Sequence, residues 1–447
     1  MDTDQHIHTS QSTFPEAPTF PRPPEKNEEQ CMKTAASDTT GIVNEQHPLP
    51  PSLARTFVHN SFANISRGQL AVSEGAQINH YGEGEEVIKL TITDHRTYEC
   101  LLLGGATGAA EAYISGYWQT SDLTGLLRLL LRNRRTIEAI NGRLAFLRRL
   151  QDRLYHFRHR DTISGSRRNI AAHYDLSNDF FNLFLDPTMM YSSGYFHHQS
   201  DTMADASRQK IDLICRKMEL TPGDRVIEIG TGWGGFALHA AMSYDCEVTT
   251  TTISDAQYQY VRGLVEREGL EHKVTVLKQD YRQLTGTFDK LVSIEMIEAV
   301  GLSNLPLFFS TCSGLLKDHG RMLLQAITIA DQRYEAARQS VDFIQRYIFP
   351  GGALPSVTAL AETSSTSSDL RIHGLEDITW HYAKTINRWS DSFKENLTEV
   401  KKMGFTEEFI RTWRYYLSYC EAGFRERAIG CIQLQLHKPG FRQSSAP

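Results

Sequence analysis

The chain has 447 residues, 40% of them hydrophobic, which is enough for two globular domains with tails. Its formal net charge of −6 argues against a nucleic-acid binder, so any attraction to anions has to come from a local patch. The seven cysteines lack C-x-x-C spacing, which is typical of reduced thiols in the cytosol and gives no zinc signature. We see no signal peptide and no apolar run of the roughly 20 residues that span a membrane.

The N-terminal part divides into a tail and a small domain. Residues 1–50 are proline-rich and polar, and we expect them to be disordered. Residues 51–133 have the pattern of a small α/β domain, with predicted strands at Val87–Thr93 and Tyr98–Leu103 and predicted helices at Ala109–Tyr117 and Leu123–Arg132. Two interpretations stay open, a structural domain that could form a homodimer and a lipid-docking domain.

A basic segment follows at 134–168. Arginines interleave with leucines and aromatic residues at i, i+3, i+4 and i+7 spacings, which predicts a basic amphipathic linker helix. Such a helix can lie on an anionic membrane surface, and it can equally be a solvated link between two domains. The aromatic segment Asn169–Tyr195 comes next and can fold over a ligand as a lid.

The segment Arg225–Phe236, RVIEIGTGWGGF, predicts a buried strand, a glycine turn and a helix start, which together make a nucleotide cradle. Its glycines also satisfy G-x-G-x-x-G, the fingerprint of dinucleotide enzymes. Glu228 suits the ammonium group of S-adenosylmethionine and would repel a pyrophosphate. The next strand, Glu247–Ile253, carries no acidic residue for a ribose diol. These residues favour S-adenosylmethionine over a dinucleotide. A third interpretation is a glycine turn that binds no ligand.

Strands and helices alternate after the cradle. Strands are predicted at Lys273–Leu277, Lys290–Ile294 and Arg321–Ile327, and helices at Ala256–Arg267 and Asn304–Leu316. This order predicts an α/β fold with a doubly wound, mostly parallel Rossmann-like sheet, whose ligands bind beyond the carboxyl ends of the strands. We therefore expect three segments to face one crevice: Gln279–Arg282, Glu295–Glu298 and Gln325–Thr328. A lid insertion is predicted at about 329–370, followed by two helices and a closing strand, Ala428–Leu436.

Several motifs together resemble the cyclopropane-fatty-acyl-phospholipid synthase family of S-adenosylmethionine-dependent methyltransferases. They are HYDLSNDFFNLFLDPTMMYSSGYF, VIEIGTGWGG, TISDAQ, IEMIEAVG, YIFPGGALPS and RTWRYYLSYCEAGFRER. The match covers a catalytic domain at about 169–440. The segment GGATGAAEAYISGYWQTSDLTGLLRLLLRN resembles the N-terminal domain of the bacterial phospholipid enzymes more weakly.

The resemblance implies S-adenosylmethionine as the cofactor. The predicted cofactor-binding residues are Tyr174, Tyr191, Ser192, Glu228, Gly230, Gly232, Gly234, Thr252, Ser254, Gln257, Asp280, Tyr281 and Arg282. Among them, the residues from Thr252 to Gln257 would hold the ribose, and Tyr281 and Arg282 would lie beside the adenine.

The resemblance also implies a bicarbonate in the active site, held by Glu298, Tyr382 and the backbone of Ile327. Two positions depart from the family pattern, since Ser193 replaces a cysteine and Gln325 replaces a histidine. Both side chains can hydrogen-bond an anion, but Gln325 cannot become cationic or transfer a proton at neutral pH. These departures weaken the product assignment more than the methyl-transfer assignment.

The implied reaction is attack of an acyl-chain double bond on the sulfonium methyl, which leaves a carbocation that a base resolves. Aromatic faces such as Tyr174, Phe180, Phe181 and Tyr382 could stabilise the cation. We expect a cytoplasmic enzyme, peripheral at the inner face of the membrane, that makes cyclopropanes in unsaturated phospholipid acyl chains. The alternatives are methyl- or methylene-branched products, methylation of a small amine on the same fold, and a lipid-binding protein without activity.

Overall fold

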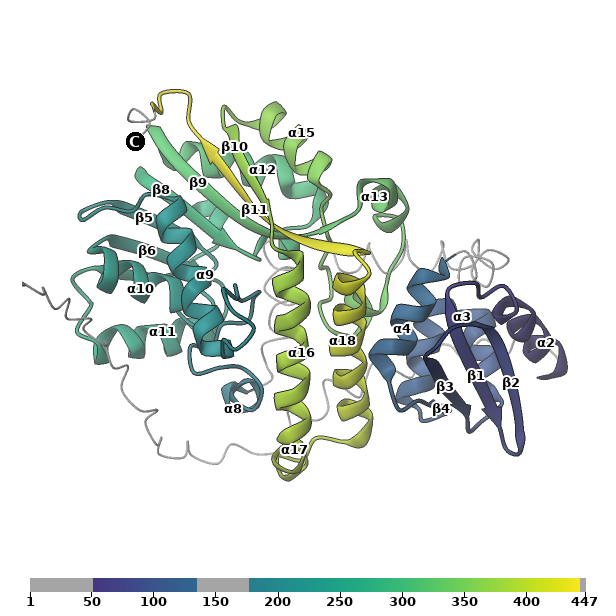
Figure 1. The fold of residues 1–447 in the computed structure, drawn as a ribbon. Helices are drawn as coiled ribbons and strands as arrows, with labels where there is room; N and C mark the ends of the chain where they lie inside the picture. Colours follow the sequence, from purple (N-terminus) through teal and green to yellow (C-terminus); the bar gives the residue numbers. More distant parts are fainter. Residues whose placement is uncertain (1–50, 135–176, 443–447) are drawn as a thin grey trace, which may run out of the picture. The chain divides into compact units, whose positions relative to one another are not determined.

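The computed structural model describes residues 51–134 and 177–442 (Figure 1). The predictions for the tail at 1–50, for nearly all of the basic helix at 134–168 and for Tyr174 lie outside the described residues. No helix in the described ranges combines the length and the apolar character needed to cross a membrane.

The small N-terminal domain has a four-stranded sheet in the order β2-β1-β3-β4. Its elements are α2 (Pro51–Phe62), β1 (Gly68–Glu74), β2 (Gln77–Glu83), β3 (Val87–Ile92), α3 (Arg96–Ile114), β4 (Trp118–Gln119) and α4 (Leu123–Arg132). The strand β1 pairs antiparallel with β2 and parallel with β3. An α/β domain was predicted at this place, and the strand β3 and the helix α4 lie where the sequence pattern puts them.

The predicted strand at Tyr98–Leu103 is wrong, because this segment belongs to the helix α3. Tyr98 and Leu102 are both buried, four residues apart, as on one face of a helix, whereas a strand would bury alternate residues. A short apolar run does not distinguish the two structures by itself. Gly105 interrupts the helix with φ 53° and ψ −131°, a conformation that glycine adopts readily and other residues rarely do.

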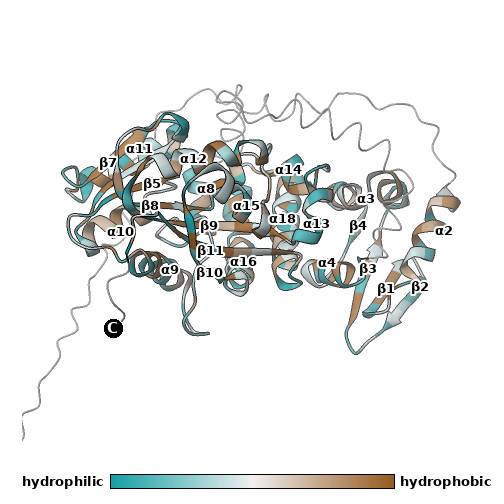
Figure 2. Ribbon diagram, turned by 90° about the horizontal axis from the view of Figure 1, so that it is seen from above, coloured by the Kyte–Doolittle hydropathy of each residue, from teal (hydrophilic) through white to brown (hydrophobic). Residues whose placement is uncertain are grey.

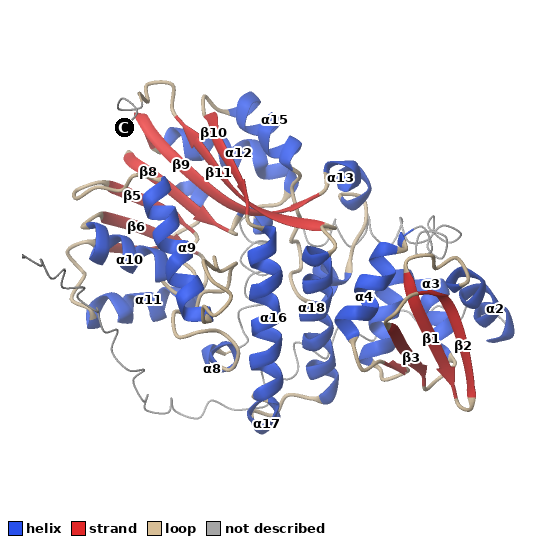
Figure 3. Ribbon diagram, in the orientation of Figure 1, coloured by secondary structure: helices blue, strands red, loops and turns tan. Residues whose placement is uncertain are grey.

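The large domain is built on a seven-stranded sheet in the order β10-β11-β9-β8-β5-β6-β7. Its strands are β5 (Arg225–Ile229), β6 (Glu247–Thr252), β7 (Val274–Lys278), β8 (Phe288–Ile294), β9 (Leu316–Ile329), β10 (Arg371–Asp377) and β11 (Ile429–His437). The strands β5 to β9 run parallel, and β11 runs antiparallel to both β9 and β10. Figure 3 shows the two sheets as separate sets of strands. The predicted doubly wound, mostly parallel sheet is confirmed.

The helices of the large domain connect these strands. They are α8 (Asn178–Asn182), α9 (Met203–Lys217), α10 (Gly235–Tyr244), α11 (Asp255–Arg267), α12 (Leu305–Gly314), α13 (Asp331–Ala337), α14 (Phe343–Tyr347), α15 (Val357–Ser367), α16 (Thr379–Glu395), α17 (Leu397–Lys402) and α18 (Glu407–Arg425), with short 3-10 turns η1 (Tyr281–Gln283), η2 (Ile297–Ala299) and η3 (Leu302–Asn304). The region predicted as a lid insertion thus carries three helices, α13 to α15, between β9 and β10.

Alternation along the strands gives the large sheet two apolar faces. On β9, Met322 and Leu324 pack in a cluster with Phe308 of α12, while Leu323 between them packs in a second cluster with Phe236 of α10. Successive side chains of a strand point to opposite faces, so a strand covered on both faces carries apolar residues at successive positions, as β9 does here. Figure 2 shows hydrophobic colouring along the central strands. Their carboxyl ends are thereby held in one rigid row.

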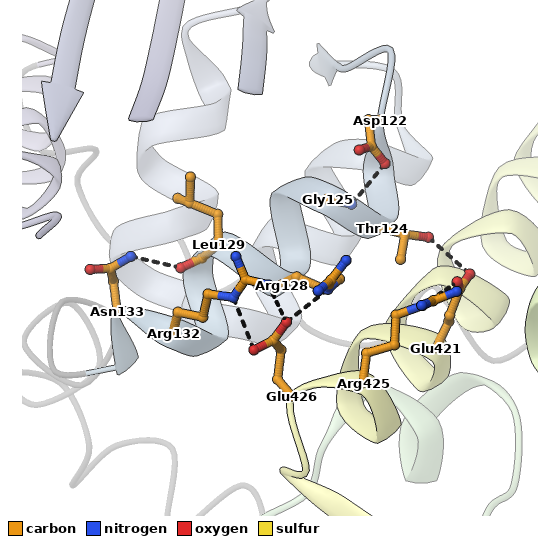
Figure 4. A network of polar contacts seen from close by, with 10 residues as sticks. All are labelled: Asp122, Thr124, Gly125, Arg128, Leu129, Arg132, Asn133, Glu421, Arg425 and Glu426. Carbon is orange, nitrogen blue, oxygen red and sulfur yellow. Dashed lines mark hydrogen bonds and ion pairs between the residues drawn. The ribbon is translucent and has the colours of Figure 1, made fainter. Parts of the chain in front are cut away.

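The helices α16 and α18 lie side by side (Figure 1), and α4 of the N-terminal domain packs against α18. Glu426, at the end of α18, accepts hydrogen bonds from Arg128 Nε at 2.7 Å and from Arg132 Nη2 at 2.8 Å (Figure 4). One turn earlier, Glu421 accepts from Thr124 Oγ1 at 3.3 Å. Polar contacts therefore fix the N-terminal domain to the helix that carries several cavity-lining residues.

Candidate active site

A cavity of about 1390 Å³ opens at the carboxyl ends of the parallel strands. All three segments that were predicted to face one crevice reach this place. Gln279 to Arg282, Glu295, Glu298 and Ile327 line the cavity, and Gln325 lies directly behind Glu295. The cavity continues between apolar side chains of the N-terminal domain, among them Leu101, Leu126 and Leu130. Ligand pockets usually measure about 300–1,000 Å³, so this one has room for more than a single small ligand.

The glycine turn after β5 forms one wall of the cavity. Gly230 and Gly232 have positive φ values of 98° and 51°, which favour glycine. A Cβ atom on Gly232 would meet nothing within 4 Å, so the backbone here borders open space. Gly234, with φ 87°, is the N-cap of α10, and the helix start leaves backbone amides available to a ligand. The predicted strand-turn-helix cradle is confirmed as a structure.

Glu228 lies at the base of this cradle, with 2% of its surface exposed. Its Oε2 accepts a hydrogen bond of 2.6 Å from Thr250 Oγ1 on the neighbouring strand. Burial raises the pKa of Glu228 to about 8. A cationic ligand in the cavity would favour the ionised form, so the group fits the ammonium of a methionine-type cofactor and does not fit a pyrophosphate.

The predicted ribose-binding residues lie at the end of β6. Thr252 Oγ1 donates to Gln257 Oε1 at 2.7 Å, and both residues line the cavity. Ser254 is the N-cap of α11, where its Oγ accepts from the Gln257 amide, and it is not among the lining residues. Its direct contact with a cofactor therefore stays a prediction, while Thr252 and Gln257 are placed where a ligand could reach them.

Asp280 and Arg282 form a bidentate pair beside Tyr281. Arg282 Nε and Nη2 donate to the two Asp280 oxygens at 2.8 and 2.7 Å. All three residues line the cavity, and the Tyr281 ring packs edge-on against Phe308. A guanidinium held flat by a carboxylate suits stacking on a planar ring, which fits the predicted adenine side of the site.

Tyr191 and Ser192 lie in the segment between α8 and α9, and both line the cavity. Tyr191 Oη is 2.9 Å from Tyr416 Oη. Ser192 Oγ accepts a 2.9 Å hydrogen bond from Lys210 Nζ, and Lys210 is completely buried in α9. Burial lowers the pKa of Lys210 to about 8, while the charges of Glu295 and Glu228 oppose that shift. A buried amine thus lies close enough to Glu295 and Glu228 to interact with both electrostatically.

Glu295 is the acceptor on which several predicted catalytic residues converge. Its Oε1 accepts from the Ser193 amide at 3.0 Å and from Gln325 Nε2 at 2.7 Å. Its Oε2 accepts from Tyr382 Oη at 2.6 Å, and Cys431 Sγ lies 3.9 Å from Oε1. Burial raises the pKa of Glu295, and these donors oppose the shift. Ser193 contributes its backbone, since its own Oγ donates to the Gly194 carbonyl.

A chain of hydrogen bonds fixes the direction of the Gln325 amide. Lys217 Nζ can only donate, and it donates to Gln433 Oε1 at 2.6 Å. The Gln433 amide group therefore donates to Gln325 Oε1, at 2.9 Å. Gln325 is left with its Nε2 facing Glu295, so it acts as a donor there. The replacement of the expected histidine by Gln325 keeps a donor at this place without a titrating group.

Glu298 is turned towards a different partner. Its Oε1 accepts from the Ile327 amide at 2.5 Å, and its Oε2 is buried without a hydrogen-bond partner among the described residues. Burial and the neighbouring Glu295 raise the pKa of Glu298 to about 8. Glu298 and Ile327 are thus brought together as predicted, but Ser193, Gln325 and Tyr382 are bonded to Glu295 instead.

Glu295 and Lys210 were missed as individual site residues. Glu295 lies in the quoted IEMIEAVG motif, and nothing in the letters shows which of its two glutamates accepts the predicted donors. Lys210 lies between Ala206 and Ile214 on the buried face of α9. A charged residue on the apolar face of a predicted helix could have been recognised in the sequence as a candidate site residue. Phe180 and Phe181, predicted to stabilise a cation, lie in the apolar core and are absent from the described cavity lining, because α8 turns both rings inward.

The parallel sheet, the glycine cradle and the buried Glu228 define an S-adenosylmethionine-dependent methyltransferase. Residues 162–434 match the family model described as mycolic acid cyclopropane synthetase. Because this match covers more than half of the chain, the chain belongs to this family, as the motifs indicate.

Two curated relatives have the same sequence identity to the chain. A tuberculostearic acid methyltransferase of Mycobacterium tuberculosis is 36% identical over 346 residues, which are 75% of this chain and 80% of the relative. The cyclopropane-fatty-acyl-phospholipid synthase of Escherichia coli K12 is 36% identical over 355 residues, which are 75% of this chain and 84% of the relative. The solved structure of mycolic acid cyclopropane synthase CmaA1 with SAH and CTAB matches with a TM-score of 0.58 at 34% identity, covering 61% of this chain and 98% of that one.

Proposed function

We propose that this enzyme transfers a one-carbon unit from S-adenosylmethionine to the double bond of an unsaturated phospholipid acyl chain and closes a cyclopropane ring. The observation that carries the proposal is the continuity of the cavity. It joins the Gly232 cradle and Glu298 to an apolar extension between α3 and α4 of the N-terminal domain. A cofactor and a hydrocarbon chain could therefore meet in one continuous cavity.

The bound cofactor would supply an electrophilic methyl group. On the protein side, Glu228, Thr252 and Gln257 would hold the polar parts of the cofactor, and Asp280 with Arg282 would flank its base. The apolar extension would align the double bond and exclude water, which would otherwise quench the carbocation on the acyl chain. Tyr382, whose ring stacks on Phe424 at 4.3 Å, presents an aromatic face at the cavity wall.

A second product is favoured by one observation, the presence of Gln325 and Ser193 where the cyclopropane synthases are expected to have histidine and cysteine. If the proton leaves a chain carbon beside the cation instead of the new methyl group, a methyl-branched olefin results. If a hydride first moves from the methylated carbon to the cationic carbon, loss of a proton from the methyl group gives a methylene branch. The chain is 36% identical to a tuberculostearic acid methyltransferase and 36% identical to a cyclopropane synthase. These identities support the branched product and the cyclopropane product equally.

The test is to incubate the purified protein with S-adenosylmethionine and vesicles of a monounsaturated phospholipid, and to analyse the released fatty acids by mass spectrometry. A gain of one CH₂ unit on the unsaturated chain is expected. Mild catalytic hydrogenation then separates the products, because it reduces a branched olefin and leaves a cyclopropane intact. A protein that turns over the cofactor only with small amines would refute the proposal.

We also propose that the enzyme acts as a peripheral protein at the cytoplasmic face of a membrane. The basic segment at 134–168 supports this, since each Lys or Arg near an anionic surface contributes about 1 kcal/mol to binding. Sedimentation with vesicles of increasing anionic lipid content should show salt-sensitive binding. Equal partitioning onto neutral and anionic vesicles would contradict it. A homodimer through the N-terminal domain stays a prediction.

A further inference from the structure

We propose that the carboxylate of Glu295 is the base that removes the proton from the carbocation, and that this enzyme consequently needs no bicarbonate. The inference rests on the proposed function, because it assigns the proton-transfer step of that reaction. The family resemblance implies a different base, a bicarbonate held by Glu298 and Tyr382.

The first support is the set of donors around Glu295. The Ser193 amide, Gln325 Nε2 and Tyr382 Oη bind its two oxygens at 2.6 to 3.0 Å. The Tyr382 hydroxyl and the Gln325 side chain are two of the groups expected to bind a bicarbonate. They and the Ser193 amide are already bonded to a covalently attached carboxylate. The Ile327 amide, also expected to bind the bicarbonate, is bonded to Glu298. The residues present therefore do not fit a separate bicarbonate at this place.

The second support is that each of these groups has a proton to donate to Glu295. Lys217 and Gln433 orient the Gln325 amide so that its nitrogen faces Glu295. The Ser193 amide can only donate. Burial raises the pKa of Tyr382 well above its ordinary value, so its hydroxyl keeps its proton and donates as well. A site built only from donors stabilises the ionised form of the acid, which is the form that a base requires.

The third support is the backbone of Glu295, which has φ 51°. A non-glycine residue in this region costs of order 1 kcal/mol or more, and such strain persists where the surroundings hold the residue for a purpose. The Glu295 amide donates to the Gln325 carbonyl at 2.8 Å and fixes the residue from the backbone side. The strained conformation places the side chain at the cavity wall, among its donors, instead of in solvent.

The position of Glu295 suits proton transfer. It lines the same cavity as Gly230 and Glu298, and its Oε2 has one described donor, Tyr382. A carboxylate oxygen can take a further proton in that case. In the ring-closing step, the C–H electron pair of the transferred methyl forms the last ring bond to the cationic carbon, and the proton goes to Oε2. Glu295 becomes neutral, and the proton leaves to solvent before the next turnover.

The experiment compares the wild type, Glu295→Gln, Glu295→Gly and the control Glu421→Gln, all as full-length protein, in buffer stripped of carbon dioxide. Glu421 is a buried glutamate, bonded to Arg425 and Thr124 outside the cavity lining. Gln at position 295 keeps the size and most hydrogen bonds of the side chain, but it cannot take the proton. We expect wild-type turnover to be independent of added bicarbonate, and Glu295→Gln to lose about 100-fold or more, the range that a general base contributes.

Glu295→Gly gives the sharper readout, because glycine accepts φ 51° and leaves the donors facing an empty space. Formate and bicarbonate should then bind there. We expect both to raise the melting temperature of this variant above a chloride control and to restore part of its turnover. Neither should affect the wild type. Cofactor binding, measured by calorimetry, should stay within about threefold in all variants, since Glu295 is not assigned to the cofactor.

The two proposals fail differently. Wild-type turnover that rises with bicarbonate, or a Glu295→Gln variant as active as the control, would refute the role of Glu295 and leave the lipid reaction standing. A Glu295→Gly variant that binds cofactor but responds to neither anion would also refute it. A wild type that modifies no unsaturated lipid would refute the proposed function, and the melting-temperature response of Glu295→Gly would still decide whether Glu295 fills an anion site.

Discussion

Tyr382 Oη donates a hydrogen bond of 2.6 Å to Glu295 Oε2, and this contact joins the helix α16 to the end of the strand β8. Tyr382 is buried, Glu295 is partly buried, and both line the cavity. Hydrogen bonds to charged groups contribute about 1.5–3 kcal/mol each, more than neutral ones. The contact therefore bears on the charge state of Glu295 directly.

Replacement of Tyr382 by phenylalanine removes this donor and keeps the ring that stacks on Phe424. We expect kcat to fall about 10-fold or more, because the carboxylate loses one charge-assisted hydrogen bond. The KM for lipid should change little. Tyr244→Phe is the matched control, since Tyr244 also donates to a carboxylate, Asp212, away from the cavity. Equal rates for the two variants would contradict the assignment.

Lys210 is the buried cation that acts on Glu295. A positive charge near a carboxylate lowers its pKa, so Lys210→Met should raise the pKa of Glu295. The ionised base would then form only at higher pH, and the acidic limb of the kcat profile should move to higher pH. Four titratable groups interact electrostatically with Glu295 and can contribute to the pH profile: Lys210, Glu298, Tyr382 and Cys431.

A defect of folding alone would lower the rate of Lys210→Met equally at every pH, so the profile distinguishes the two causes. Lys438→Met is the control, because Lys438 is also largely buried but pairs with Asp369 outside the cavity lining. Its pH profile should match that of the wild type. An unshifted acidic limb in Lys210→Met would remove Lys210 from the electrostatics of the base.

The raised pKa of Glu228 predicts that a proton is released when the cofactor binds. With a pKa of about 8, raised by burial, Glu228 holds its proton at pH 7 in the free protein. A cationic ligand favours the carboxylate, so binding should expel the proton and strengthen as pH rises towards 8, by up to about tenfold per pH unit. Calorimetry in phosphate and in Tris should give different heats, since the two buffers take up the proton with different enthalpies.

The variant Glu228→Gln tests this linkage. It should bind S-adenosylmethionine more weakly, and its binding heat should be the same in both buffers. Identical heats for the wild type in the two buffers would show that Glu228 is already ionised before the cofactor arrives.

A substitution of Glu426 tests how strongly the polar contacts attach the N-terminal domain to α18. It accepts from Arg128 and Arg132 of α4 (Figure 4), and all three side chains keep some contact with solvent. Glu426→Ala should therefore cost only about 1 kcal/mol of stability, measured by denaturant unfolding at low salt. The loss should shrink as salt is added, because salt screens exposed pairs. Glu407→Ala, at the exposed start of α18, should leave stability unchanged.

The sequence pattern predicts the central parallel strands of the large domain well because most of them are apolar runs separated by helices of regular period. The cradle at Gly230 to Gly234 follows from the same pattern. The segment Tyr98–Leu103 was assigned wrongly, because an apolar run of that length suits a strand and a helix equally. The convergence of Ser193, Gln325 and Tyr382 on Glu295 could not be predicted, since these residues lie far apart in sequence and only the folded sheet brings their donors to one carboxylate.

The left-handed backbone at Glu295 has a consequence for how such enzymes could diverge. Glycine is the residue that this conformation tolerates best, and a single nucleotide substitution converts a glutamate codon into a glycine codon. One base change could thus turn a self-sufficient enzyme into one whose rate follows the supply of dissolved carbon dioxide, with no other change to the fold.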